Sequence, residues 1–495
     1  MKAEQHVVIL GGGPAGLATG HELSLNGTKV TVLERNGFVG GLCRTLHIQG
    51  YRFDLGGHRW FTKNEDLNEW FRRLMTGELV MVNRISRIYY NRKYFFYPIR
   101  FGDIIKRTGP FTILHAGLAF LWASLRRSVS DKPIVNMKQA YVSQFGSKLY
   151  DMFFRRYSEK VWGRPCSELS ADWVSQRSKG LSIWTVVREA LIGADKKKFT
   201  TLIDEFMYPR YGYMRVPERM AEDITKQGHD VLLDATVTAL TYNGPGDFDV
   251  HYTRGGKAQS IKASAVVSTI PLGVLARILT PKCPLEVEQA ARQLEFRDLI
   301  TVNVMLRCKQ VSPDTWLYVQ DEDVLFGRLH EPKNWSKDMV PDEAHTSLVL
   351  ECFCSKGDSI WNLTDDQIVQ RCVRDLVDKL QFIKDEEVEG ASVVRTTEAY
   401  PVYDLQYAHK IGTIKNFLNG FDGLHIVGRG GTFRYNNSDH SIEMGLLLGQ
   451  RLLGQNIDHL AVNTESNYHE IKDGEEPQRD QYVFRPPTLV RPKEV

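Results

Sequence analysis

The start of the chain contains glycines at a spacing that suits the binding of a pyrophosphate. Gly11, Gly13 and Gly16 follow directly on the short apolar run Val7–Leu10, and a second apolar stretch ends at Glu34. Glycines let the backbone turn tightly and approach the phosphates, and the helix that follows points its positive end at them. An acidic side chain at the end of the second strand can accept hydrogen bonds from ribose hydroxyls. The pattern predicts dinucleotide binding, whereas the glycines alone would also fit a tight turn without a ligand.

Two more glycine pairs follow, Gly40–Gly41 and Gly56–Gly57, and His58 comes directly after the second of them. A nicotinamide dehydrogenase has no use for these pairs. They resemble the extension found in FAD enzymes of the glutathione-reductase and amine-oxidase type, in which one pair lies along the pyrophosphate and the next approaches the isoalloxazine ring. A bulky side chain at either place would block the cofactor, so the resemblance implies FAD rather than NAD.

Composition bounds the class of protein. With 495 residues, of which 42% are hydrophobic and 25% charged, we expect a soluble globular protein of two or three domains. The formal net charge is +3 and the basic residues are scattered, which argues against nucleic-acid binding. The seven cysteines show no CxxC spacing and the first apolar strand starts close to Met1, so we expect no signal peptide, reduced thiols and a cytoplasmic location. Cys352 and Cys354 suit one face of a strand, and no metal site is expected.

No apolar run reaches the ~20 residues that a membrane span needs. The nearest is Phe111–Leu125, which is preceded by Lys106 and Arg107 and closed by Arg126 and Arg127. We expect this run to form a buried helix of a helical subdomain. The alternative is a helix that contacts a membrane surface, which would make the protein membrane-associated.

The pattern along the chain predicts a cofactor domain that is interrupted twice. Helix-like periodicity without strand alternation fills the region from about 100 to 200, and alternating segments such as Thr301–Leu306 and Ser347–Phe353 suggest an antiparallel sheet. The stretches Ala265–Ile270 and Gly423–Val427 read as strands that return to the cofactor sheet. Insertions of this kind usually cover the carboxyl ends of parallel strands, where ligands bind.

The predicted fold class is α/β: a Rossmann-type FAD-binding domain with an inserted helical domain and an inserted antiparallel β-sheet substrate domain. The expected divisions are residues 1–98, 201–290 and 396–454 for the three parts of the FAD-binding domain, 99–200 for the helical domain, 291–395 for the sheet domain and 455–495 for an extended C-terminal tail.

Four segments resemble, in the same order, those of the UDP-galactopyranose mutases and their flavoprotein relatives within the amine-oxidase-like superfamily. The resemblance runs from residue 6 to about residue 453. The segments are Gly56–His58, Tyr157–Gly163 with Arg177, Trp316–Tyr318 with Arg328, and Ala399–Pro401 with Gly428, Arg429 and Arg434–Ser441.

The resemblance and the glycine pattern together imply three sets of site residues. The implied catalytic residues are His58, Arg177 and Arg328. The implied substrate-binding residues are Tyr157, Trp162, Trp316, Tyr318, Tyr400 and Tyr435. The implied cofactor-binding residues are Gly11, Gly13, Pro14, Ala15, Gly16, Glu34, Arg35, Gly40, Gly41, Leu42, Arg44, Gly57, His58, Val237, Gly428, Arg429, Asp439, His440 and Ser441.

The residue types in the first two sets suit a doubly charged diphosphate. Guanidinium groups bind phosphate oxygens in pairs, and phenols donate hydrogen bonds without adding charge. The alternative is that Arg177 pairs with a carboxylate on a helix, that the tyrosines belong to the core, and that Trp162 is an ordinary buried tryptophan.

The sequence offers no nucleophile of its own, because no GxSxG, HExxH or Ser/His/Asp arrangement is present. In the mutases that the chain resembles, reduced FAD attacks the anomeric carbon through N5, the nucleoside diphosphate leaves, and the sugar ring opens and recloses as the furanose. The resemblance thus implies a flavin-dependent mutase of a nucleotide-diphosphate sugar, or of a sugar on a lipid diphosphate, without net redox. FAD would be active in its reduced form, with NAD(P)H as a candidate reductant and a homodimer as a candidate assembly.

Other functions use the same fingerprint. An FAD-dependent oxidoreductase of the amine-oxidase, protoporphyrinogen-oxidase or carotenoid-desaturase kind is the second interpretation, and a flavin-binding protein without turnover is the third. An apolar tunnel would favour oxidation, whereas converging arginines and tyrosines favour a diphosphate. His58 is expected to shape the loop at the flavin, and Arg59 and Trp60 stand where the mutases usually have small or aliphatic residues, which leaves the sugar open.

Overall fold

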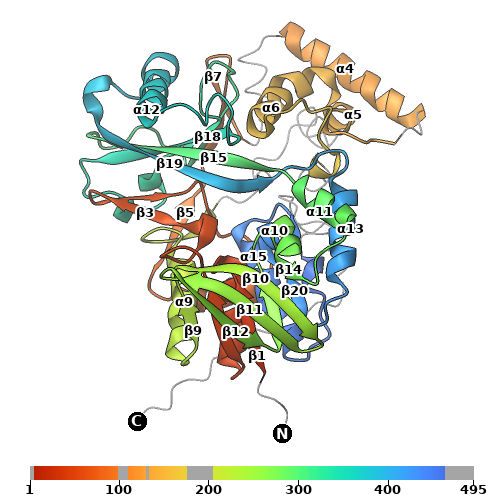
Figure 1. Cartoon of the computed structure of the whole chain (residues 1–495). Coiled ribbons are helices and arrows are strands. Elements are labelled where there is room, and N and C mark those ends of the chain that lie inside the picture. The colour runs from red at the N-terminus through yellow and green to blue at the C-terminus, as the bar shows by residue number, and fades with distance from the viewer. Residues whose placement is uncertain (1–4, 98–109, 130–132, 175–204, 463–495) are drawn as a thin grey trace.

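The computed structural model describes residues 5–97, 110–129, 133–174 and 205–462 (Figure 1). A five-stranded parallel sheet lies in the lower half of the view, and a seven-stranded sheet lies in the upper half beside a group of helices. The predicted residue Arg177 lies outside the described residues.

The parallel sheet is the centre of the cofactor domain, and the strands next to the first glycine turn are almost wholly buried. Its strands, in order across the sheet, are β20 (Leu424–Ile426), β13 (Ala265–Ser268), β1 (His6–Leu10), β2 (Lys29–Leu33) and β9 (Asp230–Leu232). Helices α1 (Pro14–Leu25) and α9 (Arg215–Lys226) pack on this sheet, and α15 (Ser438–Leu452) packs on α1. This is the Rossmann-type arrangement that the apolar runs predict.

Helices α1 and α15 approach so closely that glycine is required between them. A Cβ atom on Gly445 would lie 2.3 Å from the carbonyl oxygen of Ala15 and 2.8 Å from Cβ of Ala18. On the same face of α15, a Cβ atom on Gly449 would lie 2.7 Å from Cβ of Glu22. The contact joins the first helix of the chain to the last long one, and so brings the two ends of the cofactor domain together.

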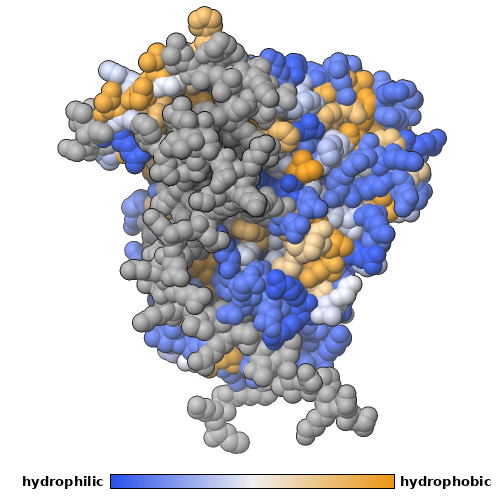
Figure 2. Space-filling model, turned by 180° about the vertical axis from the view of Figure 1, so that it is seen from behind, coloured by the Kyte–Doolittle hydropathy of each residue, from blue (hydrophilic) through white to orange (hydrophobic). Residues whose placement is uncertain are grey.

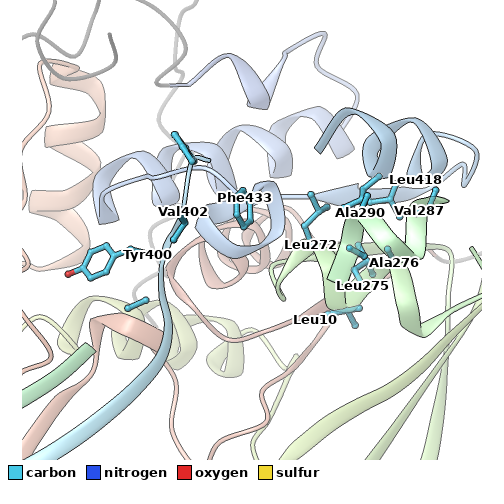
Figure 3. Packing of buried hydrophobic residues seen from close by; sticks show 14 of the residues in the cluster. Leu10, Leu272, Leu275, Ala276, Val287, Ala290, Tyr400, Val402, Leu418 and Phe433 are labelled. Carbon is cyan, nitrogen blue, oxygen red and sulfur yellow. The ribbon is translucent and has the colours of Figure 1, made fainter. Parts of the chain in front are cut away.

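A four-stranded sheet and three helices complete the lower half. The strands are β12 (Lys257–Ala263), β11 (Asp247–Arg254), β10 (Ala235–Gly244) and β14 (Leu279–Thr280), and the helices are α10 (Leu272–Ile278), α11 (Leu285–Arg292) and α13 (Tyr407–Leu418). Figure 3 shows how the apolar side chains of α10, α11 and α13 pack together, with Leu10 at the end of β1 beside them. This core supports the carboxyl end of the parallel sheet.

The seven-stranded sheet forms the upper half and is antiparallel except between β16 and β6. Its order is β19 (Val388–Pro401), β15 (Phe296–Leu306), β18 (Thr346–Cys354), β17 (Arg328–His330), β16 (Trp316–Val319), β6 (Ser86–Tyr90) and β7 (Lys93–Phe96). Helix α12 (Asp365–Arg374) packs against it. Strands β6 and β7 come from the segment 1–98, so this sheet includes residues from before the helical insertion as well as after it.

Cys352 and Cys354 lie on one face of β18, as their spacing predicts, and the Sγ atoms of Cys352 and Cys372 of α12 are 3.8 Å apart. The remaining helices and strands are η1 (Gly41–Cys43), β3 (Thr45–Ile48), β4 (Tyr51–Asp54), α2 (Glu65–Leu74), β5 (Leu79–Asn83), β8 (Glu205–Pro209), η3 (Pro332–Asn334), η4 (Lys337–Met339), η5 (Asp375–Leu380), η6 (Asp385–Glu387), α14 (Gly428–Thr432) and η7 (His459–Ala461).

The helical insertion contains α4 (Pro110–Val129), α5 (Met137–Tyr150), the π-helical turn η2 (Asp151–Arg155) and α6 (Arg156–Trp162). Lys160 of α6 donates to the carbonyl oxygens of Val319, Asp321, Val324 and Phe326, which ties the insertion to the loop after β16. Burial of its ammonium group lowers the pKa of Lys160 to about 8.

The expectation that the helix formed by Phe111–Leu125 is buried is wrong. The run does form a helix, α4, but Phe111 is 85% exposed and Trp122 is 69% exposed. The physical reason is that the alanines of α4, together with Phe120, face the protein, whereas Phe111, Leu118, Trp122 and Leu125 face outward. The fold class itself is confirmed: a Rossmann-type domain with an inserted sheet and, among the described residues, a helical insertion.

The close contact of α1 with α15 gives the first prediction. We expect Gly445→Ala to lower the free energy of unfolding by about 1–3 kcal/mol, because the added methyl group has no space beside the backbone of Ala15. Gly412→Ala in α13 is the matched control, since a Cβ atom there meets nothing within 4 Å, and it should be neutral or stabilise the protein by up to about 1 kcal/mol. Urea unfolding followed by circular dichroism measures both. Equal effects of the two variants would contradict the packing argument.

Candidate active site

The first glycine turn contains two kinds of glycine. A Cβ atom on Gly11 would lie 2.2 Å from Oγ1 of Thr269, and one on Gly16 would lie 2.3 Å from the carbonyl oxygen of Gly11, so both are required by the packing of the protein itself. Gly13 differs, because a Cβ atom there meets nothing within 4 Å. Gly13 is the N-cap of α1, and Pro14 and Ala15 form its first turn. The positive end of the helix therefore faces open space, as the binding of a pyrophosphate requires.

The second glycine pair lies against this turn. The backbone N–H of Gly40 donates to the carbonyl oxygen of Gly12 at 2.8 Å, and a Cβ atom on Gly41 would lie 3.7 Å from Cα of Gly13. Both residues have positive φ, +106° and +54°, which glycine adopts without strain. The two glycine segments thus leave bare backbone on both sides of the space in front of α1, and Leu42 follows on the wall of the cavity described below.

Glu34 ends β2 beside the same turn and is buried. Its Oε2 accepts from the backbone N–H of Gly12 at 2.8 Å, and its Oε1 accepts from the backbone and side-chain nitrogens of Asn36 at 2.9 and 2.7 Å. The carboxylate is held in place by the loop, and lone pairs remain for a ribose hydroxyl. β10 begins next to it, since the N–H of Ala235 donates to the backbone carbonyl of Glu34 at 2.8 Å, and Val237 is half-buried in that strand.

The other predicted cofactor residues are distributed around this centre. Arg35 is exposed, and the guanidinium group of Arg44 lies 4.0 Å from the ring centre of Phe38. Gly428 begins α14 with a positive φ, and a Cβ atom on it would lie 2.8 Å from Cβ of Ala15. His440 and Ser441 are buried in the first turn of α15, where Asn437 and His440 form a capping box. The N-termini of α1, α14 and α15 therefore meet at one place.

One cavity of about 1290 Å³, open to solvent, extends from this place to the seven-stranded sheet. It gathers predicted residues from segments that are far apart in the chain: Leu42, Gly57, His58, Trp316, Tyr318, Arg328, Tyr400, Arg429, Tyr435 and Asp439 line it. Residues that the resemblance implies for flavin contact and residues that it implies for substrate contact thus share one space.

Arg328 projects into the cavity from β17 and is paired with a carboxylate. It lies opposite Tyr318 of β16 and Glu351 of β18 in the sheet register. Its Nε donates to Oε1 of Glu351 at 2.7 Å, its Nη2 donates to Oε2 of Glu351, and Glu351 is fully buried. Burial lowers the pKa of Arg328 but the adjacent Glu351 raises it, and the net direction is upward. The pair is neutral overall, so Arg328 offers a fixed hydrogen-bond donor and little net charge.

Tyr400 is oriented by this pair. Nη2 of Arg328 donates to the phenol oxygen of Tyr400 at 3.0 Å. Because the oxygen accepts this bond, the phenol hydrogen is left to donate in another direction, and Tyr400 lines the cavity. Burial raises the pKa of Tyr400 above its ordinary value, so the phenol remains protonated.

Arg429 lines the cavity with its positive charge not neutralised by a carboxylate in the described part of the chain. Its Nε and Nη2 donate to the carbonyl oxygen of Asn436 at 2.8 and 2.6 Å, and its Nη1 donates to that of Ala399 at 3.0 Å. No carboxylate of the described residues forms an ion pair with it. Its guanidinium group lies 4.9 Å from the ring centre of Tyr435 and 5.6 Å from that of Tyr400. Carbonyl groups hold Arg429 in place without cancelling its charge.

Aromatic rings form two walls of the cavity. The rings of Trp316 and Tyr318 are nearly parallel, with centres 6.2 Å apart, and those of Tyr400 and Tyr435 are nearly parallel at 5.7 Å. Tyr157 of α6 lies edge-on to Tyr318 at 5.4 Å and so supports the first wall from behind. The helical insertion thereby reaches the site through one ring.

Trp162 does not line the cavity. It is buried and lies edge-on to Trp173 at 4.5 Å, and Trp173 lies edge-on to Tyr435 at 4.7 Å. Trp162 thus lies behind the second wall, and its predicted contact with the substrate stays a prediction. A large aromatic residue packs equally well in both positions, and the sequence does not distinguish them.

His58 faces the cavity as a neutral imidazole. Its Nδ1 lies 3.2 Å from the carbonyl oxygen of Gly56, and its ring centre lies 5.6 Å from that of Tyr213. Burial and the positive charge of Arg429 lower the pKa of His58 to about 4. The neighbouring Gly57 cannot carry a side chain, since a Cβ atom would lie 2.9 Å from the ring of Trp316. The loop is thus fixed against the aromatic wall, with an uncharged ring at its tip.

Asp439 lies at the N-terminus of α15 and is almost completely buried. Its Oδ2 has no hydrogen-bond partner in the described part of the chain. Burial raises the pKa of Asp439 to about 7, although the charge of Arg59 acts in the opposite direction. A buried carboxyl oxygen without a partner, at the wall of a cavity, fits a site in which a bound group donates to it. The position of this oxygen of Asp439 agrees with a bound flavin.

Several lining residues were not predicted. Arg84 lies in the loop between β5 and β6, Tyr97 follows β7, and Ser438 begins α15. Arg59 was noted only as a departure from the mutases, yet it also lines the cavity. Nothing in the local sequence marks Arg84 or Tyr97, because they reach the site only through the pairing of β6 with β16.

Comparisons with known proteins agree with this architecture. The family model for flavin-containing amine oxidoreductases matches residues 14–410. Over 91% of the chain the fold is similar to a crystal structure of reduced UDP-galactopyranose mutase, with a TM-score of 0.77, 21% identity and 94% of that chain covered. It is also similar to a double mutant of putrescine oxidase, with a TM-score of 0.65, 19% identity, and 91% and 100% of the two chains covered.

A sequence relative covers less of the chain. The phytoene desaturase of Phycomyces blakesleeanus is 46% identical over 56 residues, which are 11% of this chain and 10% of that protein. The fold and the glycine-lined turn define a flavin-dependent enzyme. The chain belongs to the family of flavin-containing amine oxidoreductases. Its fold is that of the mutase and of the amine oxidase alike, and neither likeness determines the reaction.

The open space at Gly13 gives the second prediction. We expect Gly13→Ala to leave the stability of the flavin-free protein unchanged, because its φ of −79° suits alanine and the added atom meets no protein atom within 4 Å. The affinity for FAD should fall by roughly tenfold or more, since the methyl group would occupy the approach to the pyrophosphate. Thermal unfolding of the flavin-free protein and fluorescence titration with FAD measure the two effects. An unchanged FAD affinity would remove Gly13 from the cofactor site.

The raised pKa of Asp439 gives the third prediction. Between about pH 4 and pH 7 the unfolded carboxyl group releases a proton that the folded one keeps, so this group makes the protein less stable as the pH rises. We expect Asp439→Asn to raise the free energy of unfolding of the flavin-free protein by about 1–3 kcal/mol at about pH 8, with the gain disappearing near pH 4.

Urea unfolding at the two pH values measures the difference. The exposed Asp422 provides the control Asp422→Asn, which should show no such dependence on pH. A gain of the same size at both pH values would show that the effect of Asp439→Asn is not electrostatic.

Proposed function

We propose that the protein is a flavin-dependent mutase that converts the pyranose form of a diphosphate-linked sugar to the furanose without net redox. The observation that carries the proposal is Arg429: a guanidinium group without a carboxylate partner among the described residues, beside the rings of Tyr400 and Tyr435 in the cavity. A group of this kind fits a diphosphate, because a bound anion would supply the missing counter-charge.

The chain's own residues would bind and orient the substrate. Arg429 and the phenols beside it would hold the diphosphate, and Arg328 would keep Tyr400 pointing as a donor. The Trp316–Tyr318 wall offers a flat surface for a sugar or a base. His58, being neutral, would not repel a cationic group or compete for the diphosphate. FAD, bound in its reduced form, would supply the nucleophile that the protein lacks, and NAD(P)H is a candidate reductant.

The proposed flavin position rests on three independent observations. The backbone at Gly13 and Gly41 leaves space in front of α1, and the carboxylate of Glu34 is held near the same turn. In the described part of the chain, Oδ2 of Asp439 on the cavity wall lacks a hydrogen-bond partner. The cofactor would thus extend from the glycine turn to the loop at His58. The substrate would lie beyond His58, toward the seven-stranded sheet.

A second function, oxidation of an apolar or amine substrate, is favoured by the family itself and by the phytoene desaturase segment. The lining of the cavity argues against it. Arginines and tyrosines outnumber the aliphatic residues there, and an apolar tunnel for a hydrocarbon would need the reverse.

The experiment that distinguishes the two is turnover with and without oxygen. We expect the dithionite-reduced protein to convert a nucleotide-diphosphate sugar to its furanose under nitrogen, as seen by chromatography and NMR, and the oxidised protein to be inactive. Arg429→Gln should lower kcat/KM by roughly a hundredfold or more, because it removes a charge-assisted contact from a buried site.

Controls keep this test specific. Arg451→Gln changes an exposed arginine of α15 and should leave kcat/KM unchanged. Tyr435→Phe removes one phenol hydroxyl without changing the charge. Its loss of kcat/KM tests the site if Arg429→Gln fails to fold. Arg177→Ala tests the predicted residue that lies outside the described part. Peroxide release with an amine or a polyene, and no reaction of reduced protein with any nucleotide sugar or lipid-diphosphate sugar, would overturn the proposal.

A further inference from the structure

Helix α4 packs against the protein with its small side chains. Ala116, Ala119 and Phe120 are half-buried and Ala123 is buried. The neighbouring helix α5 approaches at Gly146, where a Cβ atom would lie 2.9 Å from the backbone nitrogen of Phe120. Contact with the protein thus uses mostly methyl groups and backbone.

The large apolar side chains of α4 point the other way. Phe111, Leu118, Trp122 and Leu125 are exposed, and their spacing of seven, four and three residues places them on one stripe of an α-helix. Figure 2, which views the molecule from behind, shows hydrophobic residues gathered at the upper left, where α4 lies. A helix between protein and water has the opposite arrangement, with its large apolar side chains facing the protein.

The charges on α4 are of one sign. The helix contains no aspartate or glutamate, and Arg126 and Arg127 are both exposed in its last turn. An apolar stripe with an aromatic residue in it and cationic side chains beside it matches the boundary between the headgroups and acyl chains of an anionic bilayer. None of the described helices is long and apolar enough to cross a bilayer, so α4 would lie in the plane of the surface.

We propose that α4 is an interfacial helix that docks the enzyme on an anionic lipid bilayer. A second copy of the chain is a poorer occupant. A helix of 20 residues is about 30 Å long, and one stripe of it covers roughly 300 Å², whereas a stable protein interface buries about 800 Å² on each partner. A bilayer needs no matching partner surface, and it satisfies the apolar stripe and the two arginines at once.

The position of α4 has a consequence that rests on the proposed function. The helical insertion that contains α4 also reaches the cavity, because α4 packs on α5 and Tyr157 of the following helix α6 contacts Tyr318 of the cavity wall. A sugar carried on a lipid diphosphate would therefore be presented close to the surface at which the enzyme docks. The docking itself does not depend on the reaction, and its test measures no activity.

The test is co-sedimentation of the flavin-loaded full-length chain with vesicles. We expect binding to vesicles that contain phosphatidylglycerol and much weaker binding to pure phosphatidylcholine. Leu118→Gln/Trp122→Gln/Leu125→Gln should lower the partition coefficient by roughly a hundredfold, because three apolar side chains no longer enter the bilayer. Arg126→Gln/Arg127→Gln should lower it by roughly tenfold on the anionic vesicles only.

A matched control is Leu285→Gln, which changes a leucine of α11 that is 69% exposed, like Trp122, but lies outside the stripe. The flavin spectrum and the melting temperature of every variant should equal those of the wild type, since the changed side chains are on the surface. The proposal is overturned if the wild-type protein stays in the supernatant with anionic vesicles, or if the triple variant binds as the wild type does. It is also overturned if light scattering shows a dimer that the triple variant abolishes.

Discussion

The site depends on how closely the backbone segments approach one another at the carboxyl end of β1. Gly11, Gly16, Gly428 and Gly445 each lie where a Cβ atom would come within 3 Å of a neighbouring segment. Such approaches bring the N-termini of α1, α14 and α15 to one place, and three helix ends together create a positive potential that no single side chain supplies. Gly13, by contrast, has empty space beside it. The same residue type therefore serves two purposes here, close packing of the protein and access for a ligand.

Charge in the cavity is arranged by burial as much as by residue type. Arg328 and Arg429 look alike in the sequence, but Glu351 neutralises the first, whereas the second is held by backbone carbonyl groups alone. Desolvation keeps His58 uncharged and raises the pKa of Asp439 to about 7. Among the described residues, the result is a site in which Arg429 has no carboxylate partner and no strong acid–base pair is formed. A site of this kind binds and orients an anion well, and leaves the bond-making step to a cofactor.

The local parts of this arrangement could be predicted from the sequence, and the non-local parts could not. The glycine turn, the strand before it and Glu34 lie within 34 residues, so one segment contains the whole pattern. The pairing of Arg328 with Glu351 depends on the register of β17 with β18, and the arrival of Arg84 depends on β6 pairing with β16. Neither register follows from composition or periodicity. Trp162 could not be placed from the sequence either, because a tryptophan behind the Tyr400–Tyr435 wall and one in that wall would show the same sequence pattern.

Helix α4 shows why apolar content alone does not predict burial. The count of apolar residues in Phe111–Leu125 is that of a core helix, but alanines and Phe120 occupy one side, and Phe111, Leu118, Trp122 and Leu125 occupy the other. Because α4 packs mainly through alanines, α5 approaches it closely at Gly146. Phe111, Leu118, Trp122 and Leu125 remain exposed on the outer side of the helix. An exposed apolar stripe favours aggregation in water and is stable only against another apolar phase. Under the proposed function and the proposed docking, the polar cavity would hold the anionic headgroup of an amphipathic ligand while its chain stayed in the bilayer on which α4 lies.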